Sequence, residues 1–168
     1  MKKILSPKLM RIIKNKAKLE KILNIKITNR GKEVNIQGDP EDEYVAEKVI
    51  DALNFGFKFT EAISITEEDK IFEIINIKDH TTKKDLNTIR SRIIGKEGKC
   101  LSTLETLGNC FIEVNENKIG IIGNSIKIDK ISQAIVSIIK GAKHGNAYCY
   151  LERNQPKHIY DLGLRGEK

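Results

Sequence analysis

Apolar and polar positions alternate along the chain in ways that predict short strands and amphipathic helices. Apolar residues recur at helical spacing from Leu9 to Leu23 and again from Tyr44 to Leu53. Shorter apolar runs, several of them joined by loops rich in Gly and Asn, predict strands. These strands are residues 1–5, 25–28, 33–37, 71–77, 110–114 and 118–122. The pattern predicts an α/β (α+β) protein.

Capping residues set the expected boundaries of the helices. Ser6-Pro7 and Asp39-Pro40 each place a capping residue before a proline at the first helical position, and Gly123-Asn124 is expected to cap the last helix. Residues 57–65 form a short apolar appendage that leads into a linker, residues 66–69. The predicted helices are residues 6–24, 40–56, 85–94, 99–107 and 124–141.

The two halves of the chain repeat the same pattern. An offset of 85 residues, without a gap, places apolar and turn positions of the first half on those of the second. The aligned pairs include Ile27 with Ile112, Val34 with Ile119, Ile36 with Ile121, Gly38 with Gly123 and Gly56 with Gly141. Such periodicity indicates two copies of one small unit. We place them at residues 1–69 and 70–153, with a C-terminal tail at residues 154–168.

Charge is distributed in blocks. The net charge is +7; residues 1–32 hold eleven Lys or Arg and one acid, residues 33–69 hold two against eleven, and residues 70–168 hold seventeen against eleven. This distribution indicates a basic surface for nucleic acid or ribosome and an acidic surface elsewhere. A merely solvated surface in a lysine-rich protein is the alternative.

Several functional classes find no support in the sequence. No apolar run approaches the roughly 18 residues of a membrane span, and no long apolar stretch follows the lysine-rich start, so we expect a cytoplasmic protein without membrane contact. Cys100, Cys110 and Cys149 are odd in number and lack C-x-x-C spacing, which leaves them as small core residues. Neither a metal site nor a cofactor is expected.

The segment Ile93–Lys99 reads Ile-Ile-Gly-Lys-Glu-Gly-Lys and carries the strongest candidate chemistry. Glycine accepts positive φ, and its missing side chain allows a sugar-phosphate to approach backbone N–H groups at a helix N-terminus. The segment therefore predicts a loop that holds a phosphate backbone.

The order strand, helix, Gly-x-x-Gly, helix, strand, strand, helix resembles a eukaryotic-type (type I) KH domain, with Arg92–Lys99 as its nucleic-acid-binding loop. Two such units, an enlarged loop before the motif helix and the segment Lys140–Arg153 together resemble the archaeal two-KH ribosomal RNA processing proteins, relatives of the eukaryotic partner of the endonuclease Nob. The resemblance implies tandem type I KH domains, each a three-stranded sheet with helices packed on one face. It also implies binding of single-stranded ribosomal RNA near the 3′ end of small-subunit precursors, with the pre-small ribosomal subunit and Nob as partners.

The first unit departs from this pattern. The repeat offset places Met10-Arg11-Ile12-Ile13 where the Gly-x-x-Gly should stand, and only nine residues precede that position. The first unit is therefore expected to be truncated or degenerate, with one basic helix in place of a helix-loop-helix. Packing, protein contact and diffuse phosphate attraction remain its possible roles.

The predicted RNA-binding residues divide by role. Backbone approach is assigned to Gly95 and Gly98, with Glu97 between them pointing to solvent. Phosphate neutralisation is assigned to Lys96 and Lys99, and Arg90 and Arg92 on the preceding helix are expected to widen this basic strip. An apolar wall for bases is assigned to Ile94 together with Phe111 or Ile112, although Ile94 and Ile112 also suit a core.

We expect no catalytic residues and no enzyme. Asp79, His80 and Asp85 lie in or beside a polar loop without ligand spacing, and Gly95–Lys99 does not match the Walker spacing. Two further interpretations stay open: a KH accessory subunit of RNA degradation machinery, and a protein-bridging scaffold on the ribosome.

Overall fold

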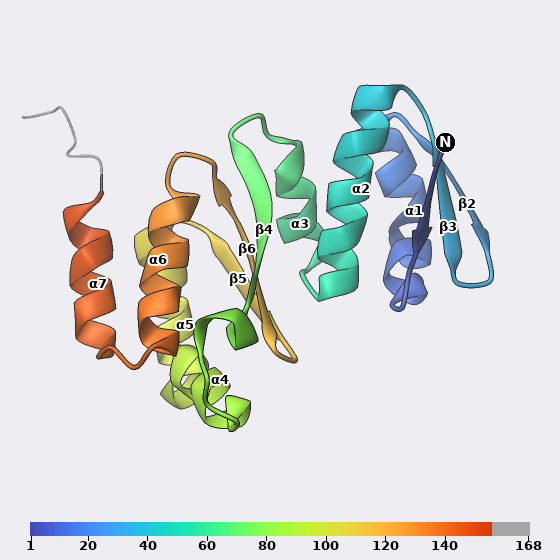
Figure 1. Cartoon of the computed structure of the whole chain (residues 1–168). Coiled ribbons are helices and arrows are strands. Elements are labelled where there is room, and N and C mark those ends of the chain that lie inside the picture. The colour runs from blue at the N-terminus through green and yellow to red at the C-terminus, as the bar shows by residue number, and fades with distance from the viewer. Residues whose placement is uncertain (156–168) are drawn as a thin grey trace, which may run out of the picture.

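The structure of the chain is a computed structural model that describes residues 1–155. It contains two three-stranded antiparallel sheets, each with its own helices (Figure 1). The elements of the first unit are β1 (Lys2–Leu5), α1 (Leu9–Leu23), β2 (Lys26–Arg30), β3 (Glu33–Gln37) and α2 (Pro40–Phe55). The elements of the second are β4 (Lys70–Asn76), α4 (Leu86–Ile94), α5 (Lys99–Gly108), β5 (Phe111–Asn115), β6 (Lys118–Asn124), α6 (Ile128–Ile139) and α7 (His144–Arg153).

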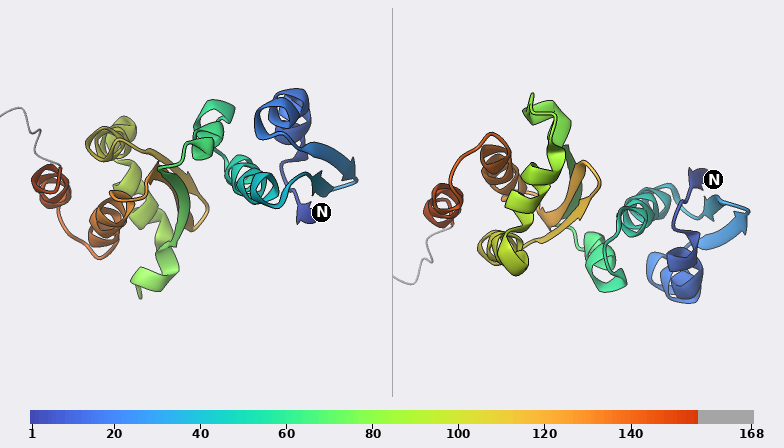
Figure 2. Two further views of the ribbon diagram at one scale, coloured as in Figure 1. Left: turned by 90° about the horizontal axis from the view of Figure 1, so that it is seen from above. Right: turned by 90° about the horizontal axis from the view of Figure 1, so that it is seen from below.

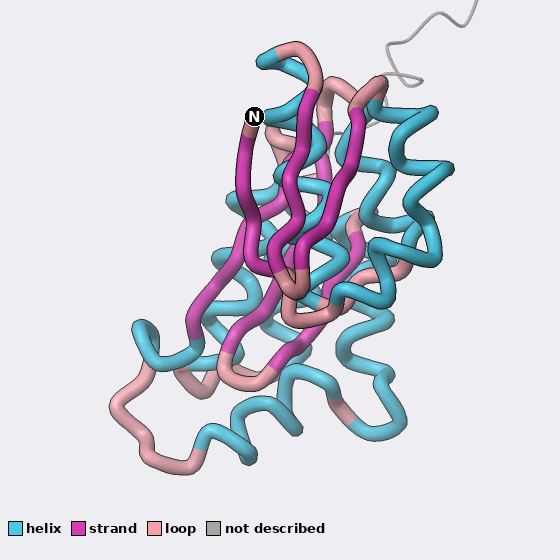
Figure 3. Tube along the Cα trace, turned by 90° about the vertical axis from the view of Figure 1, so that its right-hand side faces the viewer, coloured by secondary structure: helices cyan, strands magenta, loops and turns pink. Residues whose placement is uncertain are grey.

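The two sheets share one topology, which confirms the predicted tandem KH-type fold. Their strand orders are β1-β3-β2 and β4-β6-β5, so in each unit the last strand lies in the middle (Figure 3). The register also repeats: Ile27 pairs with Ile36, and Ile112 pairs with Ile121, 85 residues later. The sequence repeat is thus a repeat of strand pairing.

The first unit lacks one helix and the motif loop. Ile4 pairs with Val34, and Ile75 pairs with Ile119, so the first strands are related by an offset of 71 rather than 85. The difference, 85 minus 71, means that the second unit holds 14 more residues between its first strand and its second helix. Those residues make α4 and the loop, and α1 corresponds to α5. The predicted degenerate first unit is therefore confirmed.

A repeated contact fixes α1 and α5 to their sheets. Glu20 of α1 accepts a hydrogen bond from the N–H of Ile27 at 2.8 Å, and Glu105 of α5 accepts one from the N–H of Ile112 at 2.9 Å. Both pairs are 85 residues apart. Each carboxylate accepts from a backbone N–H on the free edge of its sheet, on β2 or β5. Without this acceptor, the helix packed beside the edge strand would leave that N–H unpaired.

The outer face of the second sheet is covered by the first unit. Alternation along β6 points Ile119 and Ile121 toward α4–α6, whereas Ile122 packs in the core of the first unit. Gly120 lies on that same outer face, where an added Cβ would stand 2.8 Å from the rings of both Phe55 and Phe57.

The covering segment is the end of α2 together with α3 (Phe59–Ile63), and it lies beside β4 in Figure 1. Phe57 is 1% exposed and meets the Phe72 ring of β4 edge-on, with 5.7 Å between centroids. The predicted apolar appendage therefore joins the two units, because aromatic residues on both sides bury each other.

The structure corrects four local predictions: two helix caps, described first, and then the end of the last helix and the burial of Cys149. Ser6 does not cap α1: it is buried, and its hydroxyl donates to the Asn54 side chain at 2.5 Å, so α1 begins only at Leu9. Gly123-Asn124 does not cap α6, since β6 continues through Asn124 and α6 begins at Ile128.

A further helix, α7, follows residue 141, and its buried Ala147 and Leu151 join the core of the second unit. Cys149 is exposed rather than a core residue, whereas Cys100 and Cys110 are buried, and burial raises the pKa of the Cys110 thiol to about 12. The unit boundaries after residues 69 and 153 stay predictions, and residues 156–168 of the predicted tail lie outside the described residues.

Candidate nucleic-acid interface

Two helices hold the motif loop at one end of the second unit. Asp85 begins α4 with its carboxylate, which accepts from the backbone N–H groups of Asn87 at 3.1 Å and Thr88 at 3.3 Å. Ile89 and Ile93 bury the inner face of α4 in the core of the second unit, and Cys100 and Leu104 do the same for α5. Packing at both ends therefore fixes the position of the loop between them.

Gly95 is required by the packing of the loop. Its φ of 76° and ψ of 175° belong to a region that almost only glycine occupies. An added Cβ would stand 2.6 Å from the Cβ of Cys100 and 2.8 Å from its backbone nitrogen. The missing side chain thus allows the first turn of α5 to pass directly over the end of α4.

Gly98 differs from Gly95 because it faces open space. Its φ is 74°, and no atom of residues 1–155 lies within 4 Å of an added Cβ. It immediately precedes α5, whose first turn has no side-chain cap. The first N–H groups of a helix lack intrahelical partners and attract anions. Open space at this N-terminus is the geometry that a sugar-phosphate needs.

The two loop lysines are available to a ligand. Lys96 and Lys99 are exposed, and the one ion pair that Lys99 makes within the described part of the chain is a distant one, 3.9 Å, with Glu97. Glu97 has a φ of 54°, and its side chain is 73% exposed, so it points to solvent as predicted. Such an exposed pair contributes little and can open when a phosphate binds.

The two arginines of α4 already have protein partners. Arg90 donates to the carbonyl of Glu116 at 3.1 Å and so ties α4 to the β5–β6 loop. Arg92 donates to the carbonyls of Ile138 at 3.0 Å and Ala142 at 2.6 Å, beyond the end of α6. Arg92 therefore caps the end of α6 in this structure, and its role in the basic strip stays a prediction.

The predicted apolar wall is divided between surface and core. Ile94 is 37% exposed beside the loop, whereas Ile112 is 3% exposed and offers no side-chain surface to a base. Phe111 lies on the opposite sheet face, with its ring under the ammonium of Lys70, 5.9 Å away. Leu101 and Val114 were not among the predicted residues: both are partly buried, and Val114 lies two residues after Ile112 on the same strand face. The strand period places Val114 beside Ile112 and makes it a candidate for the same wall.

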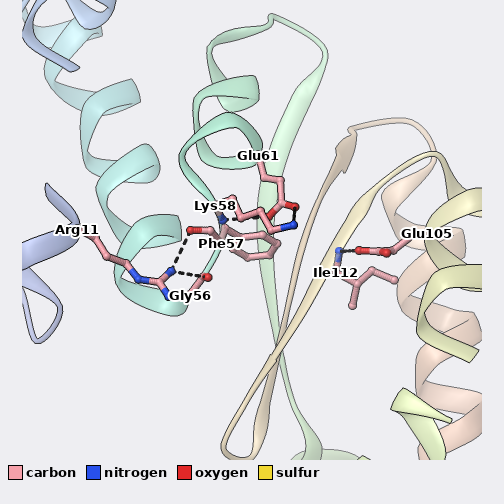
Figure 4. Close-up of polar contacts among 7 residues, drawn as sticks. All are labelled: Arg11, Gly56, Phe57, Lys58, Glu61, Glu105 and Ile112. Carbon is pink, nitrogen blue, oxygen red and sulfur yellow. Dashed lines mark hydrogen bonds and ion pairs between the residues drawn. The ribbon is translucent and has the colours of Figure 1, made fainter. Parts of the chain in front are cut away.

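The free edge of β5 is partly occupied by Glu105. Figure 4 shows its carboxylate aimed at the backbone nitrogen of Ile112. Burial raises the pKa of Glu105 above its ordinary value, and the hydrogen bond from Ile112 acts in the opposite direction. Since Glu20 makes the same contact in the first unit, this carboxylate belongs to the framework of the fold.

The residues considered for catalysis have structural roles or none. Asp85 caps α4, and the hydrogen bonds from Thr88 hold the pKa of its carboxyl below the ordinary value. Asp79 accepts a long hydrogen bond, 3.4 Å, from the side chain of Asn76. Within residues 1–155 no three His, Cys, Asp or Glu side chains come together as metal ligands. Over the same residues, no helix has the length and apolar character to cross a bilayer.

The fold and the loop define a class of protein. A sheet of order β4-β6-β5, backed by α4, α5 and α6, with an exposed Gly-x-x-Gly between the first two helices, is the arrangement of a type I KH domain. The family model for the second KH domain of PNO1, described as a eukaryotic-type KH domain (KH-domain type I), matches residues 71–156.

Relatives and solved structures agree with this match. A KH domain-containing protein of Methanocaldococcus jannaschii is 28% identical over 122 residues, covering 72% of this chain and 54% of that protein. The pre-rRNA-processing protein pno1 of Aspergillus fumigatus is 27% identical over 154 residues, covering 88% of this chain and 60% of that protein. The chain thus spans little more than half the length of these relatives.

Among solved structures, Dim2p from Pyrococcus horikoshii has a TM-score of 0.83 and 30% identity, covering 90% of this chain and 98% of that chain. The a/eIF2alpha-aDim2p-rRNA complex from the same organism has a TM-score of 0.80 and 31% identity, covering 90% of this chain and 92% of that chain. The chain belongs to the PNO1/Dim2p-like family of type I KH-domain proteins.

Proposed function

We propose that this protein binds single-stranded RNA through the loop Gly95–Lys99 and the neighbouring edge of β5. The observation that carries the proposal is the open space at Gly98, where the uncapped N-terminus of α5 and two exposed lysines converge. KH loops of this kind hold the backbone of about four nucleotides while the bases lie in an apolar groove. Ile94, Leu101 and Val114 are the side chains that supply apolar surface here.

The RNA in this proposal is precursor ribosomal RNA near the 3′ end of the small subunit. Support comes from relatives named as pre-rRNA-processing proteins and from a structural neighbour solved in a complex that contains rRNA. Cytoplasmic action on the pre-small ribosomal subunit, with the endonuclease Nob as a partner, belongs to the same proposal. The protein itself acts by binding and positioning RNA, without a catalytic group of its own.

The test compares RNA binding by the wild type and by a loop variant, Lys96→Asp with Glu97→Asp. Fluorescence anisotropy with a labelled single strand from the 3′ end of small-subunit ribosomal RNA reports affinity, and circular dichroism reports folding. We expect the variant to lose binding while its melting temperature stays near that of the wild type, because both side chains are exposed. A scrambled strand of equal length is the control for sequence. Wild-type protein that fails to bind any single strand would overturn the proposal and favour a protein-bridging scaffold.

A further inference from the structure

Helix α7 is an addition to the type I KH order, which ends with α6 in the second unit. In both views of Figure 2, α7 lies beside α5 and α6, on the side of the second unit away from the first. Ala147 and Leu151 bury one face of α7 in the core. Just beyond the end of α7, the Gln155 side chain donates to the carbonyl of Leu107, near the end of α5, at 3.1 Å. The added helix is therefore packed against one of the two helices that hold the motif loop.

The first residue of α7 contacts the end of α4, the other helix that holds the loop. The Nε2 atom of His144 lies 2.8 Å from the backbone carbonyl of Arg92. A carbonyl oxygen only accepts, so the ring nitrogen donates. Arg92 is among the last four residues of α4, and the carbonyls of such residues lack a partner within the helix. His144 therefore caps α4, and because it contacts the backbone, this cap does not depend on the Arg92 side chain.

One turn further along α7, Tyr148 contacts the start of α5. Its ring stacks on that of His144, with 6.3 Å between centroids and 23° between planes. Its hydroxyl makes hydrogen-bonding contact with the side chains of Cys100 and Thr103. Burial, and after it the contact with Cys100, raises the pKa of Tyr148 to about 12, whereas the contact with Thr103 acts in the opposite direction. Thr103 in turn donates to the carbonyl of Lys99 at 2.8 Å, so these contacts extend to the first residue of α5.

The contacts of α7 reach the motif loop from both sides. Cys100 is the residue against which Gly95 packs, since an added Cβ at Gly95 would stand 2.6 Å from its Cβ. None of residues 94–99 is buried, so the loop has no anchor of its own in the core. Its shape therefore depends on where α4 ends and where α5 begins, and His144 and Tyr148 each hold one of these two points.

We propose that His144 and Tyr148 are positioning residues for RNA binding, through which α7 fixes the two ends of the loop Gly95–Lys99. The proposal rests on the proposed function, because it concerns how that loop holds RNA. A loop that is already ordered loses less conformational entropy when a ligand binds, which raises affinity without a new contact. Loss of either positioning residue should therefore weaken binding while every contact between the loop and phosphate remains.

The test uses four variants, each of which changes one side chain of α7. His144→Ala removes the cap on α4, and His144→Gln supplies an amide N–H donor in place of the ring N–H. Tyr148→Phe removes only the hydroxyl that contacts α5. Tyr150→Phe is the matched control, because Tyr150 lies on the same helix and donates its hydroxyl to Gln133 of α6.

Binding is measured by fluorescence anisotropy with the single strand from the 3′ end of small-subunit ribosomal RNA. We expect His144→Ala and Tyr148→Phe to bind about three- to tenfold more weakly than the wild type, which corresponds to one lost hydrogen bond. His144→Gln and Tyr150→Phe should stay within about twofold of the wild type. The log-log salt slope should be the same in all variants, because each phosphate contact contributes about 0.7 to it and none is removed.

Hydrogen exchange in the RNA-free protein, followed by NMR, gives a second readout. The N–H of Gly98 donates to the carbonyl of Gly95 at 3.3 Å, inside the loop. Its exchange should be at least about threefold faster in His144→Ala and Tyr148→Phe than in the wild type, because the loop opens more often. Tyr150→Phe should exchange as the wild type does. Melting curves verify that each variant is folded.

The outcomes separate this inference from the proposed function. Wild-type affinity in His144→Ala or Tyr148→Phe overturns the inference, and so does unchanged exchange at Gly98. An equal loss of affinity in His144→Gln or Tyr150→Phe would show general damage to α7 and would also overturn it. A shallower salt slope in His144→Ala would mean that His144 contacts phosphate directly, which contradicts a positioning role. If the wild type binds no single strand, the proposed function itself fails, and this inference fails with it.

Discussion

The two glycines of the motif are predicted to respond differently to the same substitution. Gly95→Ala forces a Cβ into a backbone region that costs about 1–3 kcal/mol for other residues. The added atom also stands 2.6 Å from the Cβ of Cys100, and such overpacking costs about 1–3 kcal/mol more. Gly98→Ala meets open space and carries only the cost of a left-handed conformation, about 1–2 kcal/mol. The expected losses in the free energy of unfolding are therefore about 2–6 and about 1–2 kcal/mol.

Urea unfolding followed by circular dichroism measures both losses against the wild type. For a chain of this size, 1 kcal/mol shifts the melting temperature by about 2–4 °C, so Gly95→Ala should melt roughly 4–24 °C below the wild type and Gly98→Ala roughly 2–8 °C below it. The order of the two variants is the decisive result. If Gly95→Ala melts within about 3 °C of the wild type, or above Gly98→Ala, the close packing of Gly95 against the start of α5 does not require glycine at this position.

Three further predictions concern residues that support the fold of the two units. Phe57→Ala should lower the free energy of unfolding by about 3–5 kcal/mol, because this ring is fully buried between the units; a loss below about 1 kcal/mol in urea titration would contradict that role. Arg92→Ala should lower the free energy of unfolding by about 2–4 kcal/mol through two lost hydrogen bonds. Fluorescence anisotropy should show a nearly unchanged RNA affinity; a large loss of affinity in folded protein would mean that Arg92 contacts the RNA.

Glu113→Gln tests a half-buried carboxylate. Burial and the nearby Glu61 raise the pKa of Glu113 above its ordinary value of 4.5, so folding favours the protonated form and the charged form costs stability as pH rises through that window. Melting of Glu113→Gln should therefore exceed that of the wild type at pH 7 and equal it near pH 4; an unchanged difference at both pH values would refute this assignment.

Much of the second unit was predictable from local patterns. The Gly-x-x-Gly between two helical patterns, and the hairpin that follows, depend on glycine at positive φ and on strand alternation, which are local properties. The repeat offset of 85 also determined the register of Ile27 with Ile36 and of Ile112 with Ile121, because pairing across a short hairpin follows from its loop length. The missing motif of the first unit was visible for the same reason.

Other features depend on residues distant in the sequence. Arg90 and Arg92 are equally basic in the sequence, yet only the arrival of the β5–β6 loop and the end of α6 makes both into structural donors. Ser6 has the pattern of a helix cap, but burial against Asn54 gives its hydroxyl another partner. Local propensity cannot predict these partners, since they lie 26 to 50 residues away in the sequence.

The sequence by itself therefore determined the class of fold, the duplication and the single Gly-x-x-Gly loop within the described chain, because each follows from spacing and backbone preference. Only the tertiary structure decided which side chains remain free to bind. It buried Ile112 and placed Phe111 on the far face of the sheet, it turned Arg92 toward α6, and it left Ile94, Lys96 and Lys99 at the surface. It also brought Phe57 against Phe72, which joins the two units into one body and positions α1 on the same side as α5.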